Sequence, residues 1–132
     1  VTAQETNPLD LAFNTDGTKM FIVGFSGVDV GEYTLSTGFD VSTATFVDAF
    51  SVSGQDTAPR AVAFSTTGTK MFVLGSTGQD VNEYTLSTGF DVSTATFVDA
   101  FSVATEETAP TGLALTFLLQ CLQMPLVLQA KK

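Results

Sequence analysis

The sequence contains 132 residues, with 14 acidic and 5 basic side chains, no histidine and one cysteine, Cys121. Its net charge of -9 repels phosphate backbones and anionic lipid headgroups, so we expect no nucleic-acid partner and no membrane partner. Without histidine, one chain cannot supply Ser-His-Asp, Cys-His or zinc-hydrolase chemistry, and a single cysteine excludes an intrachain disulfide. The opening VTAQETNPLD has neither a starting methionine nor a signal peptide, so we expect a piece excised from a longer protein.

An internal repeat of 51 residues organises the sequence. Residues 8–58 and 59–109 are identical at 36 of 51 aligned positions, and both contain EYTLSTGFDVSTATFVDAFSV without one substitution. A partial third unit occupies residues 110–116, after which residues 117–132 form a divergent apolar tail. We therefore expect a single repeat domain across residues 1–132. Recent copying can account for the identity of the units, but units this similar adopt the same structure.

Each full unit predicts four antiparallel strands, as the second unit shows. Residues 59–65 (PRAVAFS) are small and apolar on both alternating faces, which indicates a strand packed on both sides. The glycine of TTGTK then predicts a tight turn. The second, third and fourth strands are expected at 71–75, 81–86 and 94–103. The fourth strand alternates Phe97, Asp99, Phe101 and Val103 on one face with Val98, Ala100 and Ser102 on the other, which indicates a partly exposed strand. The first two strands read as buried, so we expect burial to decrease from inner to outer strands, as in a propeller blade.

The run APRAVAFSTTGTKMFVLGSTGQDVNEYTL resembles the YVTN and NHL-like β-propeller repeats, a group that includes lactonase-like propellers. The shared features are the proline, a small-apolar strand ending in Phe-Ser, a turn glycine and a hydrophobic second strand. The resemblance covers residues 7–115 and implies an all-β fold of propeller blades with four antiparallel strands. It implies a scaffold and no particular activity. A β-solenoid also stacks repeats and is the alternative, although an antiparallel unit of this length favours the propeller.

Two full blades do not close a ring, because propellers have typically about four or more blades. We therefore expect the ring to be completed by oligomerisation, with six blades favoured. A homodimer follows if the tail adds strands to a third blade in each chain, and a homotrimer is the alternative if each chain supplies two.

The tail changes character at Leu115, where the repeat pattern ends in LTFLLQCLQMPLVLQAKK. A Leu-rich run followed by two lysines is one pattern of a membrane anchor. Three glutamines and Pro125 interrupt the run, so we expect no spanning helix. A shifted reading frame or a truncated gene is a second explanation of the abrupt loss of pattern.

Two pairs of acidic residues recur at the start of the third strand in each unit: Asp29 with Glu32, and Asp80 with Glu83. Calcium accepts loosely arranged oxygen ligands, including carboxylates and backbone carbonyls. The sequence therefore predicts a candidate calcium site at each pair. The alternative is that the aspartates cap turns.

Asp10 and Arg60 occupy first strands, where a propeller places its central channel, and both interrupt the apolar pattern. We expect them to mark a ligand-binding channel mouth, with surface drift as the alternative. Asp40 and Asp91 are expected to make Asx-type bonds to the backbone that follows them. The recurring aromatic residues are expected in the core and not on a sugar-stacking platform.

The sequence predicts a structural or ligand-binding propeller module that presents loops on a rigid ring to a carbohydrate or protein ligand. We expect it to be extracellular or associated with the cell envelope. The alternative is a propeller enzyme of the lactonase or glycan-lyase type, with a metal in the central channel. An enzyme is expected to have a cluster of polar residues at the channel that is not repeated from unit to unit. In this sequence only Asp10 and Arg60 are candidates for such a cluster.

Overall fold

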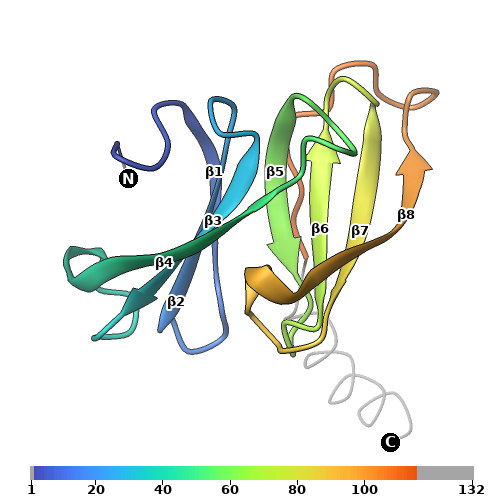
Figure 1. Cartoon of the computed structure of the whole chain (residues 1–132). Helices are drawn as coiled ribbons and strands as arrows, with labels where there is room; N and C mark the ends of the chain where they lie inside the picture. The colour runs from blue at the N-terminus through green and yellow to red at the C-terminus, as the bar shows by residue number, and fades with distance from the viewer. Residues whose placement is uncertain (1, 116–132) are drawn as a thin grey trace, which may run out of the picture.

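The structure is a computed structural model that describes residues 2–115, so the predicted tail at 117–132 lies outside the described residues. It consists of two four-stranded antiparallel sheets with strands in chain order (Figure 1). The first sheet comprises β1 (Pro8–Phe13), β2 (Lys19–Gly24), β3 (Asp29–Leu35) and β4 (Ala44–Ser51). The second comprises β5 (Pro59–Phe64), β6 (Lys70–Gly75), β7 (Asp80–Leu86) and β8 (Ala95–Ser102). Short 3-10 helices, η1 (Val41–Thr43) and η2 (Val92–Thr94), precede the last strands. The predicted all-β fold is confirmed, and the two sheets are consistent with propeller blades.

The turn between the first two strands is built in the same way in both sheets. Gly17 has a φ of 72° and Gly68 a φ of 70°, in the left-handed region that glycine adopts without strain. A Cβ atom at Gly17 would overlap the ring of Phe39, and one at Gly68 would overlap the ring of Phe90. The turn therefore requires glycine both for its backbone conformation and for the aromatic ring that covers it.

Asp40 caps η1 and Asp91 caps η2 through the Asx-type bonds that the sequence predicted, although the 3-10 helices themselves were not predicted. The Oδ1 atom of Asp40 accepts hydrogen bonds from the backbone N–H of Ser42 at 3.1 Å and from its hydroxyl at 2.6 Å. Asp91 makes the same two bonds to Ser93. These caps fix the chain as it enters the last strand of each sheet.

Side chains alternate along the strands, so each sheet has two faces. We call one the forward face and the other the rear face. The forward faces carry Phe21, Val23, Val30, Glu32 and Phe50 in the first sheet and Phe72, Leu74, Val81, Glu83 and Phe101 in the second. The rear faces, with the adjoining 3-10 helix, carry Met20, Ile22, Tyr33, Leu35 and Val41 in the first sheet and Met71, Val73, Tyr84, Leu86 and Val92 in the second. The main core forms where the forward face of the first sheet packs against the rear face of the second.

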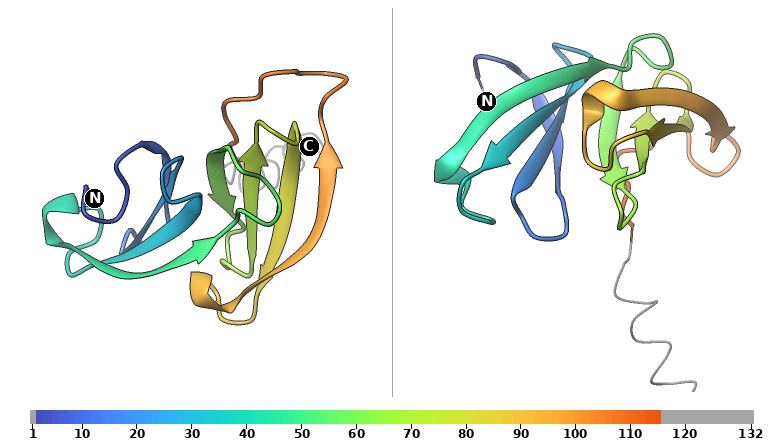
Figure 2. Two further views of the ribbon diagram at one scale, coloured as in Figure 1. Left: turned by 45° about the horizontal axis from the view of Figure 1, so that its top comes forward. Right: turned by 60° about the horizontal axis from the view of Figure 1, so that its bottom comes forward.

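The first strands of the two sheets, β1 and β5, lie next to each other. The chain leaves β4 and runs back to β5 to begin the second sheet (Figure 2). Burial decreases outward as predicted, since β2 and β5 are mostly buried and β4 and β8 mostly exposed. The strand β1 differs from the prediction, and its Leu11 is 51% exposed. Within residues 2–115 no sheet packs on the rear side of β1, whereas β5 packs against the first sheet.

Candidate functional site

The contact between the two sheets, which we call the joint, contains a buried charge. Glu32 is 2% exposed. Its carboxylate accepts a hydrogen bond from the backbone N–H of Val92 at 3.0 Å and pairs with the Lys19 ammonium at 2.6 Å. The Lys19 ammonium also donates to the carbonyl oxygen of Phe90 at 2.6 Å. A buried carboxylate requires partners of this kind, because leaving it unpaired costs several kcal/mol, on the order of 3–5. Glu32 therefore fixes the second sheet against the first.

Aromatic rings fill the apolar part of the joint. Phe21 of the first sheet packs on Phe64, with ring centroids 4.2 Å apart, and on Phe90 at 6.1 Å. Phe50 meets Tyr84 edge to face, with centroids 5.6 Å apart. Edge-to-face and offset pairs of this kind are favoured by the charge distribution of the rings. The prediction that the repeated aromatic residues form core is confirmed for Phe21, Tyr33 and Tyr84. It is wrong for Phe46, Phe97 and Phe101 on the outer strands, which are 39%, 40% and 72% exposed.

Tyr84 adds a polar contact to the same interface. Its hydroxyl donates to Oε1 of Gln55, in the link between the sheets, at 3.2 Å. Burial first, and then the charges of Asp80 and Asp56, raise the pKa of Tyr84 to about 12. The hydroxyl is therefore a hydrogen-bond donor at neutral pH.

Asp10 and Arg60, the predicted channel-mouth residues, make separate contacts. The Asp10 carboxylate accepts a hydrogen bond from the backbone N–H of Val62 at 3.0 Å and so links β1 to β5. Arg60 donates from Nε to the hydroxyl of Ser76 at 3.1 Å. Among the described residues no ion pair joins Asp10 to Arg60. Asp10 thus contributes to the joint between the sheets.

The predicted calcium pairs are divided between the two faces of their strands. The strand β3 begins at Asp29, so Asp29 lies on the rear side and Glu32 on the forward side. Glu83 pairs with Lys70 at 2.6 Å, and Asp80 accepts from the amide of Asn82 at 2.8 Å. The structure therefore does not bring either pair together. Within residues 2–115, no group of three or more acidic or cysteine side chains gathers as a metal site.

A hollow of about 110 Å³ opens on the rear face of the first sheet and holds Asp29, Glu5 and Tyr33. Burial first, and then the charge of Glu5, raise the pKa of Asp29. The equivalent position of the second sheet is occupied by the buried side chain of Asn82, where the first sheet has Gly31. The hollow is therefore the space that a missing asparagine side chain leaves beside Asp29.

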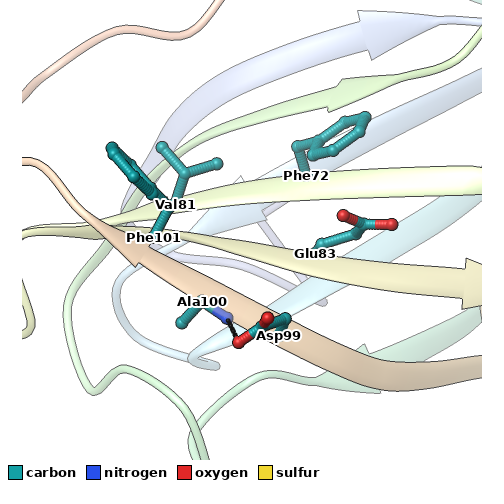
Figure 3. Close-up of a pocket in the computed structure, with 6 residues that line it drawn as sticks. All are labelled: Phe72, Val81, Glu83, Asp99, Ala100 and Phe101. Atoms are coloured by element: carbon teal, nitrogen blue, oxygen red, sulfur yellow. Dashed lines mark hydrogen bonds between the residues drawn. The ribbon is translucent and has the colours of Figure 1, made fainter.

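A second hollow, of about 210 Å³, lies on the forward face of the second sheet. Figure 3 shows Phe101 beside Val81 at one end and Phe72 with Glu83 at the other. Asp99 lies at its edge and accepts the backbone N–H of Ala100 at 2.8 Å. Phe101 is 72% exposed. The hollow is therefore lined by apolar side chains and by the carboxylates of Glu83 and Asp99.

One recurring acidic residue was missed by the sequence analysis. Glu5 accepts hydrogen bonds from the backbone N–H groups of Asn7, Ser26 and Gly27. In the second unit, the Asp56 carboxylate accepts hydrogen bonds from the backbone N–H groups of Ala58 and Gly78. In the partial third unit, Glu107 accepts one from the backbone N–H of Ala109. An acidic residue three positions before the proline of every unit is the sequence signal that points to this role.

These contacts shift the pKa of Glu5. Burial alone would raise the pKa of this carboxyl. The backbone N–H groups of Gly27, Asn7 and Ser26 outweigh burial, so the pKa is lowered from its ordinary value. The charged form of Glu5 is therefore the one that holds the turn.

No protein-family model and no curated protein matches the sequence. Solved structures do resemble it. A functionally unknown protein from Desulfotomaculum acetoxidans is 21% identical, with a TM-score of 0.55 over 75% of this chain and 28% of that one. A candidate 6-phosphogluconolactonase from Bacteroides uniformis is 16% identical, with a TM-score of 0.55 over 72% of this chain and 26% of that one. The periplasmic gluconolactonase of Pseudomonas aeruginosa is 18% identical, with a TM-score of 0.51 over 80% of this chain and 26% of that one.

The chain thus spans 26–28% of the length of these three structures. At this level of identity the likeness concerns the fold, which is that of gluconolactonase-like, propeller-type proteins. None of the helices within residues 2–115 is long and apolar enough to cross a membrane.

Proposed function

We propose that this chain is a structural or ligand-binding β-propeller module. Its blades are held rigidly face to face, and the turns at their ends are presented to a partner. The observation that supports this function is the joint, in which the buried Glu32 carboxylate is fully satisfied by Lys19 and Val92. This carboxylate orients the two sheets, and it is not itself available as an acid or base for chemistry.

The ligand class that fits the module is a carbohydrate or another protein, bound by loops. An extracellular or envelope location is consistent with the periplasmic gluconolactonase among the structures of similar fold. Carbohydrate binding is tested with the full chain on an array of oligosaccharides, with heat-denatured protein as the control. Saturable binding of the folded chain supports a carbohydrate ligand, and binding equal to that of the denatured control contradicts it.

A lactonase-type enzyme is the second candidate, because two structures of similar fold are described as a gluconolactonase and a candidate 6-phosphogluconolactonase. The acids available to it are Asp29 and Glu5 in the hollow of about 110 Å³. The full chain is incubated with glucono-δ-lactone, with and without calcium, and acid release is followed at constant pH. The module proposal predicts the rate of buffer alone. A rate that rises with protein concentration and is lost in Asp29→Asn, but kept in Asp48→Asn, would establish the enzyme instead.

A further inference from the structure

The two units have nearly the same sequence, but one difference in the third strand changes the hydrogen bonding of the sheet. Gly31 of β3 corresponds to Asn82 of β7. The Asn82 side chain is buried, and its amide donates to Oδ1 of Asp80 at 2.8 Å. The first sheet has no such side chain, and the hollow of about 110 Å³ lies beside Asp29, the copy of Asp80. The first sheet therefore keeps the acceptor and lacks the donor.

This hollow is built within one blade. Its walls come from β2, β3 and β4 and from Gln4 and Glu5, in the segment that leads into β1. In the second sheet, the donor and the acceptor that correspond to it likewise belong to one strand, β7. The hollow is thus a property of the first sheet itself and does not depend on what lies against that sheet.

Two polar groups in the hollow have no hydrogen-bond partner among residues 2–115, namely the Asp29 carboxylate and the Tyr33 hydroxyl. The Tyr33 residue is only 4% exposed. Since no fully buried polar side-chain atom in this part of the chain lacks a partner, the unpaired atoms of both groups reach the hollow. In the second sheet the copies of both groups are paired within the protein. A nearly buried hydroxyl and a carboxylate are thus left for a ligand to satisfy.

The charges around the hollow favour a cation. Glu5 is 3% exposed, and its carboxylate oxygens already accept three backbone N–H groups, so it contributes negative charge but is not the free acceptor. Burial first, and then the charges of Asp29 and Glu5, raise the pKa of Tyr33. Its hydroxyl is therefore neutral at pH 7, and a neutral hydroxyl can accept a hydrogen bond. None of the side chains that line the hollow is basic.

The other walls fit a small organic group. The rings of Tyr33 and Phe46 stand edge to face with centroids 5.5 Å apart, and both line the hollow. Aromatic rings attract ammonium groups through the negative charge of their faces. A Cβ atom at Gly31 would meet nothing closer than 3.6 Å, so a carbon atom fits beside the backbone there. Ile22 and Ala49 complete the apolar wall.

We propose that this hollow binds the primary ammonium group of a small organic amine. The ammonium donates to the Asp29 carboxylate and to the Tyr33 hydroxyl oxygen, and the short alkyl part lies against Ile22 and Phe46. Gln4 also lines the hollow, and its copy Gln55 accepts a hydrogen bond in the second sheet. The inference goes beyond the proposed module, because it adds a ligand site inside a blade to the loops that the module presents.

The test titrates the isotope-labelled full chain with methylammonium chloride at pH 7 and follows the amide chemical shifts around Tyr33 by NMR. Gly31→Asn fills the hollow with the side chain that the second sheet carries, so it is expected to fold and to lose binding. Asp29→Asn removes the charged acceptor and is expected to weaken binding about tenfold or more. The matched control is Asp48→Asn, which removes an exposed acid of β4 outside the hollow and is expected to bind like wild type.

Sodium chloride at the same concentrations controls for ionic strength, and acetamide supplies a neutral N–H donor. We expect saturable shifts with methylammonium in wild type and in Asp48→Asn, and none with sodium chloride. No saturable shift in wild type, or equal binding in Gly31→Asn, would overturn the inference. Acetamide that binds as tightly as methylammonium would overturn the assignment to a cation. These results need neither a lactone nor an oligosaccharide, so a failure here is distinguishable from a failure of the proposed function.

Discussion

The Glu32 carboxylate of the first sheet accepts the backbone N–H of Val92 in the second sheet at 3.0 Å. Their copies, Glu83 and Val41, have no second sheet against them within residues 2–115, and their side chains are more exposed. Identical sequence therefore occurs in two environments, one buried and one exposed. The same substitution at each copy measures what burial contributes, and this is the basis of the first prediction.

Glu32→Ala is expected to lower the free energy of unfolding by about 3 kcal/mol, because it leaves the Lys19 ammonium and a buried N–H without their partner. Glu83→Ala is expected to cost about 1 kcal/mol or less, since its ion pair with Lys70 is partly exposed. Urea unfolding is measured for both at several protein concentrations, so that a contribution from association is detected. Equal losses in the two variants would contradict the structural role assigned to Glu32.

Gly31→Asn is expected to stabilise the first sheet. Glycine in a strand interior costs about 0.5–1 kcal/mol through its backbone freedom. A Cβ at this position finds its nearest neighbour, a ring carbon of Tyr33, at 3.6 Å, which is ordinary contact. The new amide is placed to donate to Asp29, as Asn82 donates to Asp80. The melting temperature is compared with that of Gly31→Ala, and an asparagine gain no larger than the alanine gain would exclude the amide bond.

Glu5 and Asp29 are expected to give opposite effects of pH on stability. The pKa of Glu5 is lowered in the folded state, so its stabilisation is present above its ordinary pKa of 4.5 and is lost as pH falls through the folded value. The pKa of Asp29 is raised, so the folded state binds its proton more tightly and the charged form destabilises the fold at neutral pH.

Glu5→Gln should therefore lower stability at pH 7, and Asp29→Asn should raise it. The Glu5 difference should shrink as pH falls from its ordinary pKa of 4.5 through the lowered folded value. The Asp29 difference should shrink as pH falls through the raised folded value and be lost below its ordinary pKa of 3.8. Urea unfolding from pH 3 to 7 measures both, with Asp48→Asn at an exposed position as the control. Effects of the same sign for Glu5 and Asp29 would contradict the environments described for them.

Calcium is expected to leave the melting temperature unchanged, because Asp29 and Glu32 lie on opposite sides of one strand and Glu32 is bound to Lys19. A ligand that binds the folded state raises the melting temperature as its concentration rises. Thermal unfolding is followed with increasing calcium and, as a control for ionic strength, with sodium chloride. A rise specific to calcium and abolished by Asp29→Asn and Asp80→Asn would restore the calcium sites predicted from the sequence.

The sequence predicts the strands well because glycine turns, Asx caps and alternating apolar residues act locally. The bonds of Asp40 to Ser42 need only two residues of separation, and they are present. The calcium pairs were predicted at the start of the third strand in each unit, and Asp29 and Asp80 do begin β3 and β7. The prediction left out that, within a strand, alternation sends a residue three positions later to the other side.

The contacts of Glu32 and Glu5 could not be predicted from residue spacing within a strand or turn. Glu32 meets Val92 across 60 positions of sequence, and Glu5 meets Gly27 across 22. Each depends on how one segment folds back on another, which residue spacing within a strand does not reveal. The recurrence of Lys and Glu 13 positions apart in both units is the one sequence signal for the ion pairs.

The absolute mass of the full chain in solution, measured by light scattering on a sizing column over a wide range of concentrations, tests the central claim most directly. A ring completed by oligomerisation predicts a discrete mass of two or three times 13.9 kDa, for the homodimer or the homotrimer. A chain that keeps the single-chain mass at every concentration would contradict it, because two blades would then be stable without a partner that completes the ring.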